Sequence, residues 1–387
     1  MRILFDLYTT QIQIGGSAEY VRRVFYSLID YAKNNCADIE IIGLVDSSLN
    51  KWSYKDLTPN VLTQNGINIA DYASSSLSDI ICRYDINLVF IGCAQFWGER
   101  FDVQNISCSC VCVIHDLQDE EFCKNKINEY LYLYDYKKLC KYILSRLLLG
   151  NRSMRIPPII KSANNNPQIQ LITVSQYSKQ SILYNYNIES ERIMVLYSPE
   201  RIINKTENVL DSNNVDYLIN NNIRYYLLLS SNRPIKNARK VLKAFERYQR
   251  KSQKDVYIVT TGGIGKQFER HIPMPYLTDY ELDLVMKNCY ALIFASFFEG
   301  FGYPAVEAMK YGKPVLASNV TSIPEILGNA PIYFSPIYES DIFSALSKLS
   351  DDEYDSYTNK SLERYHSIRE RQEADLETLL KLITNTK

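Results

Sequence analysis

Two glutamates, two prolines and three glycines fall within nineteen residues of this chain, in the segment FFEGFGYPAVEAMKYGKPV that starts at Phe297. Seven residues separate Glu299 from Glu307. An apolar run, ALIFA, precedes the segment as a predicted strand, and Pro304 marks a helix start because proline is favoured at the first helical position. The exposed N–H groups and the dipole of such a helix start form a site for an anion such as phosphate.

The glycines and carboxylates of this segment suit a ligand that carries both phosphate and hydroxyl groups. Gly300 and Gly302 let the backbone approach a ligand without an intervening Cβ. A nucleotide sugar would satisfy the pattern, with Glu307 on the ribose and Glu299 on the sugar. A structural alternative stays open, because early helix carboxylates often only complement the dipole and a glycine-rich turn can be only a turn.

The composition is that of a soluble globular protein. Apolar residues make up 46% of the 387 residues and charged residues 22%, and the formal net charge is −1. A charge so close to zero predicts no nucleic-acid partner. No stretch approaches the ~18 consecutive apolar residues of a membrane span.

The nine cysteines and the N-terminus favour a reduced, cytoplasmic protein. Cys108, Cys110 and Cys112 alternate along a strand-like run, so we expect them to share a buried face, with a metal or redox role as the less favoured reading. The first residues, MRILFDLYTT, carry Asp6 and lack a small-residue cleavage site. They therefore predict a first strand rather than a signal peptide.

The chain is long enough for two cores, and strands and helices alternate along it in two rounds. A polar segment from Ser198 to Asn222 interrupts the pattern and predicts a linker. We therefore expect an α/β protein of two doubly wound, Rossmann-like domains that face a central cleft. These are an N-terminal acceptor-binding domain, 1–200, and a C-terminal nucleotide-sugar-binding domain, 201–367, with a last helix over about 368–387 that packs back on the first domain.

The predicted elements can be stated by residue. The expected strands are Arg2–Leu7, Ile39–Val45, Asn87–Ile91, Val111–Ile114, Leu171–Val174 and Arg192–Leu196 in the first round, and Arg224–Leu229, Val256–Thr260, Ala291–Ala295, Pro314–Ala317 and Ile332–Phe334 in the second. The expected helices include Ala18–Lys33, Ala238–Tyr248, Asp279–Lys287 and Pro304–Tyr311.

The segment at Glu299 resembles the E-x7-E signature of retaining glycosyltransferases of family 4, which have the two-domain fold called GT-B. The likeness continues through GKPVLASNVTSIPEIL, where family members carry a similar strand, turn and Pro-Glu helix start. The resemblance implies a catalytic role for Glu299. It implies donor binding by the loop and helix residues Gly300, Phe301, Gly302, Tyr303 and Glu307.

Further landmarks of the family follow in order in the C-terminal half. YYLLLSSNRPIKNARK resembles the turn that carries the family's basic pair, which implies that Arg233 and Lys236 neutralise the leaving diphosphate. A solvated basic turn is the alternative. TTGGIGKQF resembles the glycine loop beside the nucleotide and implies a contact at Gly263. PYLTDYELDLVM matches the place where backbone groups near Leu277 and Thr278 hold the base.

The N-terminal half resembles the family less closely. QIGGSAEYVRRV places Gly15 and Gly16 between the first strand and a helix, where the family's glycine loop lies under the donor phosphates. VIHDL puts His115 at a strand end, matching the family's histidine that contacts the donor sugar. In TVSQYS, we assign Ser175 to helix capping rather than to function.

The resemblance implies transfer of a sugar, with retention, from a nucleoside-diphosphate sugar to a hydroxyl of a growing surface glycan or lipid-linked oligosaccharide. It implies no metal and no cofactor other than the donor, because basic side chains and helix N-termini neutralise the diphosphate. Two alternatives stay open. One is a nucleotide-sugar 2-epimerase of the same fold, and the other is a nucleotide-sugar-binding module without catalysis.

A basic and apolar segment runs from Tyr130 to Lys161. Its cations are Lys137, Lys138, Lys141, Arg146, Arg152, Arg155 and Lys161, interleaved with Tyr, Leu and Ile. Such a segment can dock on an anionic membrane, where each cation contributes about 1 kcal/mol. A polyprenyl-linked acceptor at the inner face of the cell membrane would then be within reach. A core helix with basic edges is the alternative.

Overall fold

The computed structural model describes residues 1–35, 38–96, 106–124, 131, 136–149, 157–201, 213–252 and 254–384. The chain divides into two compact units. Unit 1 comprises Met1–Ile127, Cys140–Ile202 and Arg371–Lys387, and unit 2 comprises Asn128–Leu139 and Ile203–Glu370. The main crossing, after Ile202, lies close to the predicted boundary after residue 200.

Unit 1 is built on a seven-stranded sheet in the order β3-β2-β1-β4-β5-β6-β7, and every paired strand is parallel. The strands are β1 Arg2–Asp6, β2 Glu40–Val45, β3 Asn68–Asp71, β4 Leu88–Ile91, β5 Ser109–Ile114, β6 Ile169–Thr173 and β7 Ile193–Val195. All six predicted strands of the first round are confirmed. The prediction missed β3, because NIAD is too short and too polar to stand out.

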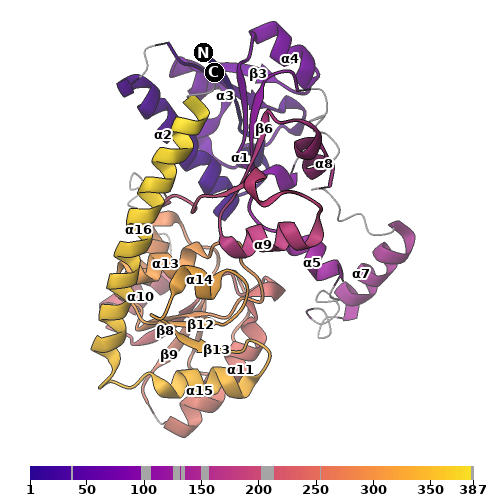
Figure 1. Cartoon of the computed structure of the whole chain (residues 1–387). Coiled ribbons are helices and arrows are strands. Elements are labelled where there is room, and N and C mark those ends of the chain that lie inside the picture. The colour runs from indigo at the N-terminus through magenta and orange to yellow at the C-terminus, as the bar shows by residue number, and fades with distance from the viewer. Residues whose placement is uncertain are drawn as a thin grey trace. The chain divides into compact units, whose positions relative to one another are not determined.

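Helices cover both faces of this sheet (Figure 1). They are α1 Tyr8–Ile12, α2 Gly16–Asn35, α3 Pro59–Gln64, α4 Leu77–Tyr84, α5 Gln118–Lys124, α8 Pro157–Asn165 and α9 Gln176–Asn185, with short 3-10 helices η1 Ser47–Leu49, η2 Lys55–Leu57, η3 Ala94–Phe96 and η6 Ser190–Arg192. Phe25 of α2 packs on Phe5 on one face. As predicted, Ser175 caps α9, because its hydroxyl accepts from the Ser178 N–H.

Unit 2 repeats the design with a six-stranded parallel sheet in the order β10-β9-β8-β11-β12-β13. The strands are β8 Tyr225–Leu228, β9 Tyr257–Thr260, β10 His271–Pro273, β11 Ala291–Phe294, β12 Val315–Ser318 and β13 Ile332–Phe334. The helices are α10 Asn213–Asn220, η7 Pro234–Lys236, α11 Ala238–Ser252, α12 Asp279–Asn288, α13 Tyr303–Lys310, α14 Ile323–Leu327 and α15 Glu339–Lys348. The five predicted strands are confirmed, and the three-residue β10 was missed.

Two predictions at the edges of unit 2 were wrong. The expected linker contains α10, whose Val215 and Leu218 are buried, so spaced apolar residues outweigh its asparagines. The last helix, α16, runs from Tyr354 to Thr384 rather than starting near residue 368. Its residues up to Glu370 belong to unit 2 and those from Arg371 to unit 1. The helix α7, Tyr136–Leu149, likewise carries residues of both units.

Each unit has its own apolar core. In unit 1, Cys110 and Cys112 of β5 lie in the core together with Cys108, which directly precedes the strand, as the alternating pattern predicted. In unit 2, the corresponding core joins the sheet to α11 and α15 through residues such as Phe245 and Leu346. Both cores are therefore complete enough to hold the strand ends, and the loops that follow them, in fixed positions.

Candidate active site

The order of the strands defines a topological switch point at the carboxyl edge of each sheet. In unit 2 the chain winds outward from β8 to β9 and β10 on one side, and from β11 to β12 and β13 on the other. The neighbours β8 and β11 therefore form the topological switch point, where ligands bind outside the carboxyl ends of parallel strands. The turn after β8 carries Arg233 and Lys236, and the loop after β11 carries Glu299.

An ion pair joins these two loops at the switch point. The Lys236 ammonium donates a hydrogen bond to the Glu299 carboxylate. Both side chains are mostly buried, with 12% and 16% of their surface exposed, and the Lys236 nitrogen lies 5.3 Å from the centroid of the Phe294 ring. The Lys236 ammonium is a mostly buried positive charge beside one carboxylate and one aromatic face. A bound phosphate could also accept a hydrogen bond from it.

The backbone around the ion pair is held from both sides. The Phe297 N–H donates to the Ile235 carbonyl at 2.9 Å, which fixes the Glu299 loop to the Lys236 turn. The Glu299 N–H donates to the Thr321 hydroxyl at 3.2 Å, and the Ser322 hydroxyl donates to the Glu299 carbonyl at 2.8 Å. The position of Glu299 is thus set by three loops.

The glycine loop leads directly into α13, as predicted. Gly302 is its N-cap with a φ of 101°, in the left-handed region, and a Cβ there would lie 3.3 Å from the Phe294 ring. Pro304 stands in the first turn. Glu307 is the fifth residue of the helix and lies outside its first turn, which holds no acidic residue. The dipole alternative is weaker at that position, because the dipole's effect fades within the first turn.

The other predicted donor residues of unit 2 lie on neighbouring turns. Gly263 has a φ of 81°, and its N–H donates to the Met274 carbonyl at 3.0 Å. Thr278 caps α12 in a reciprocal capping box with Glu281. Its N–H donates to Glu281 and its carbonyl accepts from Leu282. Both backbone groups of Thr278 are therefore engaged, while Leu277 stays a prediction.

Arg233 and Lys236 occupy different environments although they share one turn. Arg233 is exposed and caps η7, with its N–H donating to the Ser230 carbonyl at 3.0 Å. Lys236 ends η7 and points its ammonium toward Glu299. Asn237, with a φ of 59°, then ties this turn to the loop after β13 by donating to the Pro336 carbonyl at 2.8 Å. The structure thus gives Lys236 the better defined position.

In unit 1 the switch point lies between β1 and β4, and His115 follows the next strand, β5. The His115 Nε2 lies 2.9 Å from the Gly92 carbonyl at the end of β4, so Nε2 carries the hydrogen. The Tyr20 ring of α2 meets the imidazole edge-on, with centroids 4.8 Å apart. Gly16 begins α2, although α1 intervenes between β1 and the glycine pair, which the sequence did not predict.

Sequence reasoning missed several polar groups of unit 1 around His115. The Gln95 amide oxygen accepts from the His115 N–H at 3.3 Å, and its amide nitrogen donates to the Asp116 carbonyl at 3.2 Å. The thiol of Cys93, which follows Gly92, donates to the Gln95 amide oxygen at 3.3 Å. The only signal for Cys93 and Gln95 was that they follow a predicted strand. The contact of Tyr20 with His115 brings the N-terminal part of α2 close to the strand end that carries His115.

Burial keeps the imidazole of His115 neutral near pH 7. It lowers the pKa of His115 to about 4, although the bond to Gly92 favours the charged form. Burial also lowers the pKa of His271, in β10, to about 4. Because both folded pKa values lie below the unfolded value of about 6.5, these groups favour folding above pH 6.5, and that contribution is lost as the pH falls toward 4.

We therefore expect two of the three histidines to show constant imidazole NMR shifts between pH 8 and about 5.5. The spectrum of His115→Gln assigns the His115 signal. Movement of that signal with a midpoint near pH 6.5 would contradict a neutral, buried donor to Gly92.

No described helix is long and apolar enough to cross a membrane. Within the same ranges, no cluster of three or more His, Cys, Asp or Glu side chains is arranged to hold a metal ion.

Residues 211–365, which contain the Lys236–Glu299 pair and Glu307, match the family model described as Glycosyl transferases group 1. The O-antigen chain mannosyltransferase RfbU of Salmonella typhimurium is 26% identical over 193 residues, which cover 46% of this chain and 50% of that protein. The serotype-specific mannosyltransferase WbdA of Escherichia coli is 24% identical over 392 residues, which cover 91% of this chain and 44% of that protein. The chain thus spans about half the length of the curated relatives it matches.

Solved structures share the whole architecture. HepE of Anabaena, in complex with UDP and glucose, covers 100% of both chains at 16% identity with a TM-score of 0.64. A putative UDP-N-acetylglucosamine 2-epimerase from Listeria monocytogenes covers 100% of this chain and 96% of its own at 12% identity, with a TM-score of 0.56. At these identities the likeness shows the fold, which consists of two Rossmann-like α/β domains of the GT-B type, as predicted.

Proposed function

We propose that this protein is a retaining glycosyltransferase of the family 4 type. It would move a sugar from a nucleoside-diphosphate sugar to a hydroxyl of a growing surface glycan or lipid-linked oligosaccharide in the cytoplasm. The names of its curated relatives favour mannose as that sugar. The observation that carries the proposal is the Lys236–Glu299 pair at the switch point of unit 2, between the basic turn and the glycine loop.

The proposed chemistry uses charges that are already in place. As the bond from the sugar to the diphosphate breaks, negative charge builds on the departing oxygens. Lys236 would then exchange its contact with Glu299 for a phosphate oxygen, with the N-terminus of α13 and Arg233 adding further positive potential. Glu299, released from the lysine, would accept a hydrogen bond from a sugar hydroxyl. We infer that no metal is needed and that the departing phosphate helps deprotonate the acceptor on the same face.

The test is release of nucleoside diphosphate from a panel of nucleotide sugars that includes mannose donors with each base, with and without lipid-linked acceptors. Release that requires an acceptor supports transfer. NMR of the product gives the anomeric configuration, and an excess of chelator tests metal independence. Inversion at the anomeric carbon, or activity lost with chelator and regained with metal, would overturn those parts of the proposal.

The two alternatives differ from transfer in simple observations. The GT-B likeness to the 2-epimerase means that the fold alone does not separate the two activities. A 2-epimerase would convert the sugar of its nucleotide donor without any acceptor. A module without catalysis would bind the nucleotide and leave it intact. The presence of Lys236, Glu299 and Glu307 in one unit favours catalysis over simple binding.

We also propose a peripheral membrane contact through the basic segment from Tyr130 to Lys161. Part of this segment, including Arg152 and Arg155, lies outside the described residues. Within α7, Lys137 and Lys141 are exposed together with Ile143 and Leu144. Because the side chains of Ile143 and Leu144 are exposed rather than in the core, this part of α7 does not support the core-helix alternative. Cations beside exposed apolar groups suit an anionic interface.

The double change Lys137→Glu and Lys141→Glu should reduce co-flotation with anionic liposomes at low salt by about 10-fold or more, because each cation contributes about 1 kcal/mol. The matched control is Lys287→Glu with Lys348→Glu, two exposed lysines of unit 2 that give the same change in net charge. We expect the control to float like the wild type. A wild type that does not float with anionic lipid would remove this proposal.

A further inference from the structure

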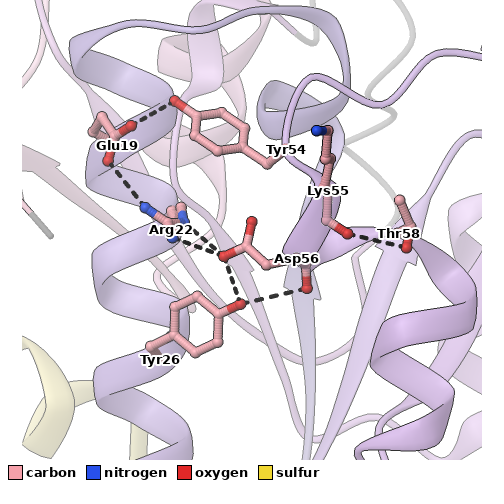
Figure 2. Close-up of polar contacts among 7 residues, drawn as sticks. All are labelled: Glu19, Arg22, Tyr26, Tyr54, Lys55, Asp56 and Thr58. Atoms are coloured by element: carbon pink, nitrogen blue, oxygen red, sulfur yellow. Dashed lines mark hydrogen bonds and ion pairs between the residues drawn. The ribbon is translucent and has the colours of Figure 1, made fainter. Parts of the chain in front are cut away.

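A polar network joins α2 to the loop after β2 in unit 1 (Figure 2). The Arg22 guanidinium of α2 donates to the Asp56 carboxylate at 2.8 and 2.9 Å and lies 3.7 Å from the Glu19 carboxylate. Tyr26 and Tyr54 place their rings on this guanidinium, with centroids 5.8 and 5.5 Å from its central carbon. The Glu19 and Arg22 side chains are about as buried as core residues, with 5% and 3% exposed.

The two tyrosine hydroxyls serve different parts of this network. The Tyr26 hydroxyl donates to Asp56 at 2.9 Å and so closes the ion pair between α2 and the loop. The Tyr54 hydroxyl donates to the carboxylate of Glu19, in the first turn of α2, at 2.8 Å. Burial, and after it the charge of Glu19, raises the pKa of Tyr54, so the hydroxyl keeps its proton and stays a donor.

The Gly15 turn is joined to Tyr54 through Glu19. The Gly15 carbonyl accepts from the Glu19 N–H at 2.9 Å, and the Glu19 carboxylate accepts from the Tyr54 hydroxyl. Gly15 has a φ of 151°, and a Cβ placed on it would meet no atom within 4 Å, so the outer side of the turn is open. The neighbouring Ile14 is 74% exposed. A turn that is fixed by hydrogen bonds on its inner side and accessible on its outer side is pre-organised to bind a ligand.

The loop that carries Tyr54 is itself fixed to the start of the turn. The Ser53 hydroxyl donates to the Gln11 carbonyl at 2.9 Å, and the Lys51 ammonium donates to the Ile12 carbonyl at 3.1 Å. The Gln11 side chain exchanges two hydrogen bonds with the Asp46 backbone. Movement of the turn would therefore break contacts along the whole loop after β2.

We propose that Tyr54 and Glu19 are positioning residues, which hold the Gly15–Gly16 turn in the conformation that turnover requires at the switch point of unit 1. This proposal rests on the proposed glycosyltransferase function. The helix α2, which follows this turn, reaches the strand end that carries His115, because the centroids of the Tyr20 and His115 rings are 4.8 Å apart and His115 donates to the Gly92 carbonyl. A shift of about 1 Å there would misplace whatever binds between them.

The test compares Tyr54→Phe with Tyr26→Phe. Each change removes one hydroxyl from the same network and leaves the ring on Arg22, so both should lower the thermal midpoint by similar amounts. We expect Tyr54→Phe to lower kcat by about 10-fold to 100-fold and Tyr26→Phe to change it by less than about 2-fold. Affinity for the nucleoside without phosphates should stay at the wild-type value in both, because its proposed contacts, such as Glu307, are in unit 2.

A second variant does not depend on how well Tyr54→Phe folds, and a second measurement does not depend on activity. Gly15→Ala disfavours the same backbone conformation without a clash and should show the same loss of kcat at unchanged nucleoside affinity. Amide hydrogen exchange over residues 8–20 should rise in Tyr54→Phe and not in Tyr26→Phe. Equal kcat or equal exchange in the two tyrosine variants, or full turnover in Gly15→Ala, overturns the positioning role. A wild type that transfers no sugar overturns the glycosyltransferase proposal instead, and the exchange data then decide whether Tyr54 holds the turn.

Discussion

Lys236→Ala is expected to lower kcat by about 100-fold or more with saturating donor and acceptor, by analogy with the loss of one electrostatic donor elsewhere. The physical reason is that a cation aimed at the diphosphate gains strength as charge builds there, so it stabilises the transition state more than the bound donor. The affinity for nucleotide sugar should change much less than kcat. Steady-state kinetics with calorimetry of donor binding separates the two effects.

The ion pair with Glu299 calls for two controls. Lys236→Ala leaves a largely buried carboxylate without its cation, which lowers stability whatever happens to catalysis. The double variant Lys236→Ala with Glu299→Gln should regain much of the thermal midpoint and none of the turnover. Arg239→Ala, which removes a nearby exposed cation on α11, should keep near-normal kcat.

Arg233→Ala is expected to lower kcat in the same direction as Lys236→Ala, although Arg233 is exposed. Near-normal turnover of Lys236→Ala would mean that other cations neutralise the leaving group. Arg239 and Lys240 would then be the next candidates, and our interpretation of this turn would be wrong.

The local chemistry of the sequence was enough to predict the loop and helix start around Glu299. The apolar run predicts a strand, the glycines predict a turn and the proline predicts a helix start. Together they predict one strand, loop and helix unit. The pairing of Glu299 with Lys236 was not visible, since the two are 63 positions apart in the sequence. Only the strand order, which places β8 beside β11, brings their loops together.

The same limit explains what was missed in unit 1. His115 was found through the family resemblance, which matched it at the end of an apolar strand. Tyr54 and Gln95 lie in polar segments that have no periodic signal. Glu19 lies in a predicted helix, but its partner Tyr54 comes from another loop, which the helical pattern does not show. The strands β3 and β10 were not predicted for a related reason. Both are short, and they form by pairing at the edge of a sheet rather than from a strong local pattern.

Glu307→Gln should weaken nucleoside-diphosphate binding by about 1.5–3 kcal/mol, which corresponds to roughly 10-fold to 150-fold in Kd. The expected cause is loss of a charge-assisted hydrogen bond from a ribose hydroxyl to the carboxylate. Glu299→Gln should instead lower kcat and leave this Kd nearly unchanged, since Glu299 is assigned to the sugar. Isothermal titration calorimetry with the nucleoside diphosphate alone measures the effect without any need for an acceptor.

The matched control for Glu307 is Glu325→Gln, because Glu325 lies in the first turn of α14 and does complement a helix dipole. If Glu307 served only the dipole of α13, the two variants would behave alike, with a slightly lower thermal midpoint and unchanged Kd. Glu307 lies beyond the first turn, so its dipole contribution should be the smaller of the two. A Glu307→Gln variant that binds nucleoside diphosphate as tightly as Glu325→Gln would sink the ribose assignment. Glu307 would then have only a structural role in α13, and the turn around Gly263 would be the remaining candidate for binding the nucleoside.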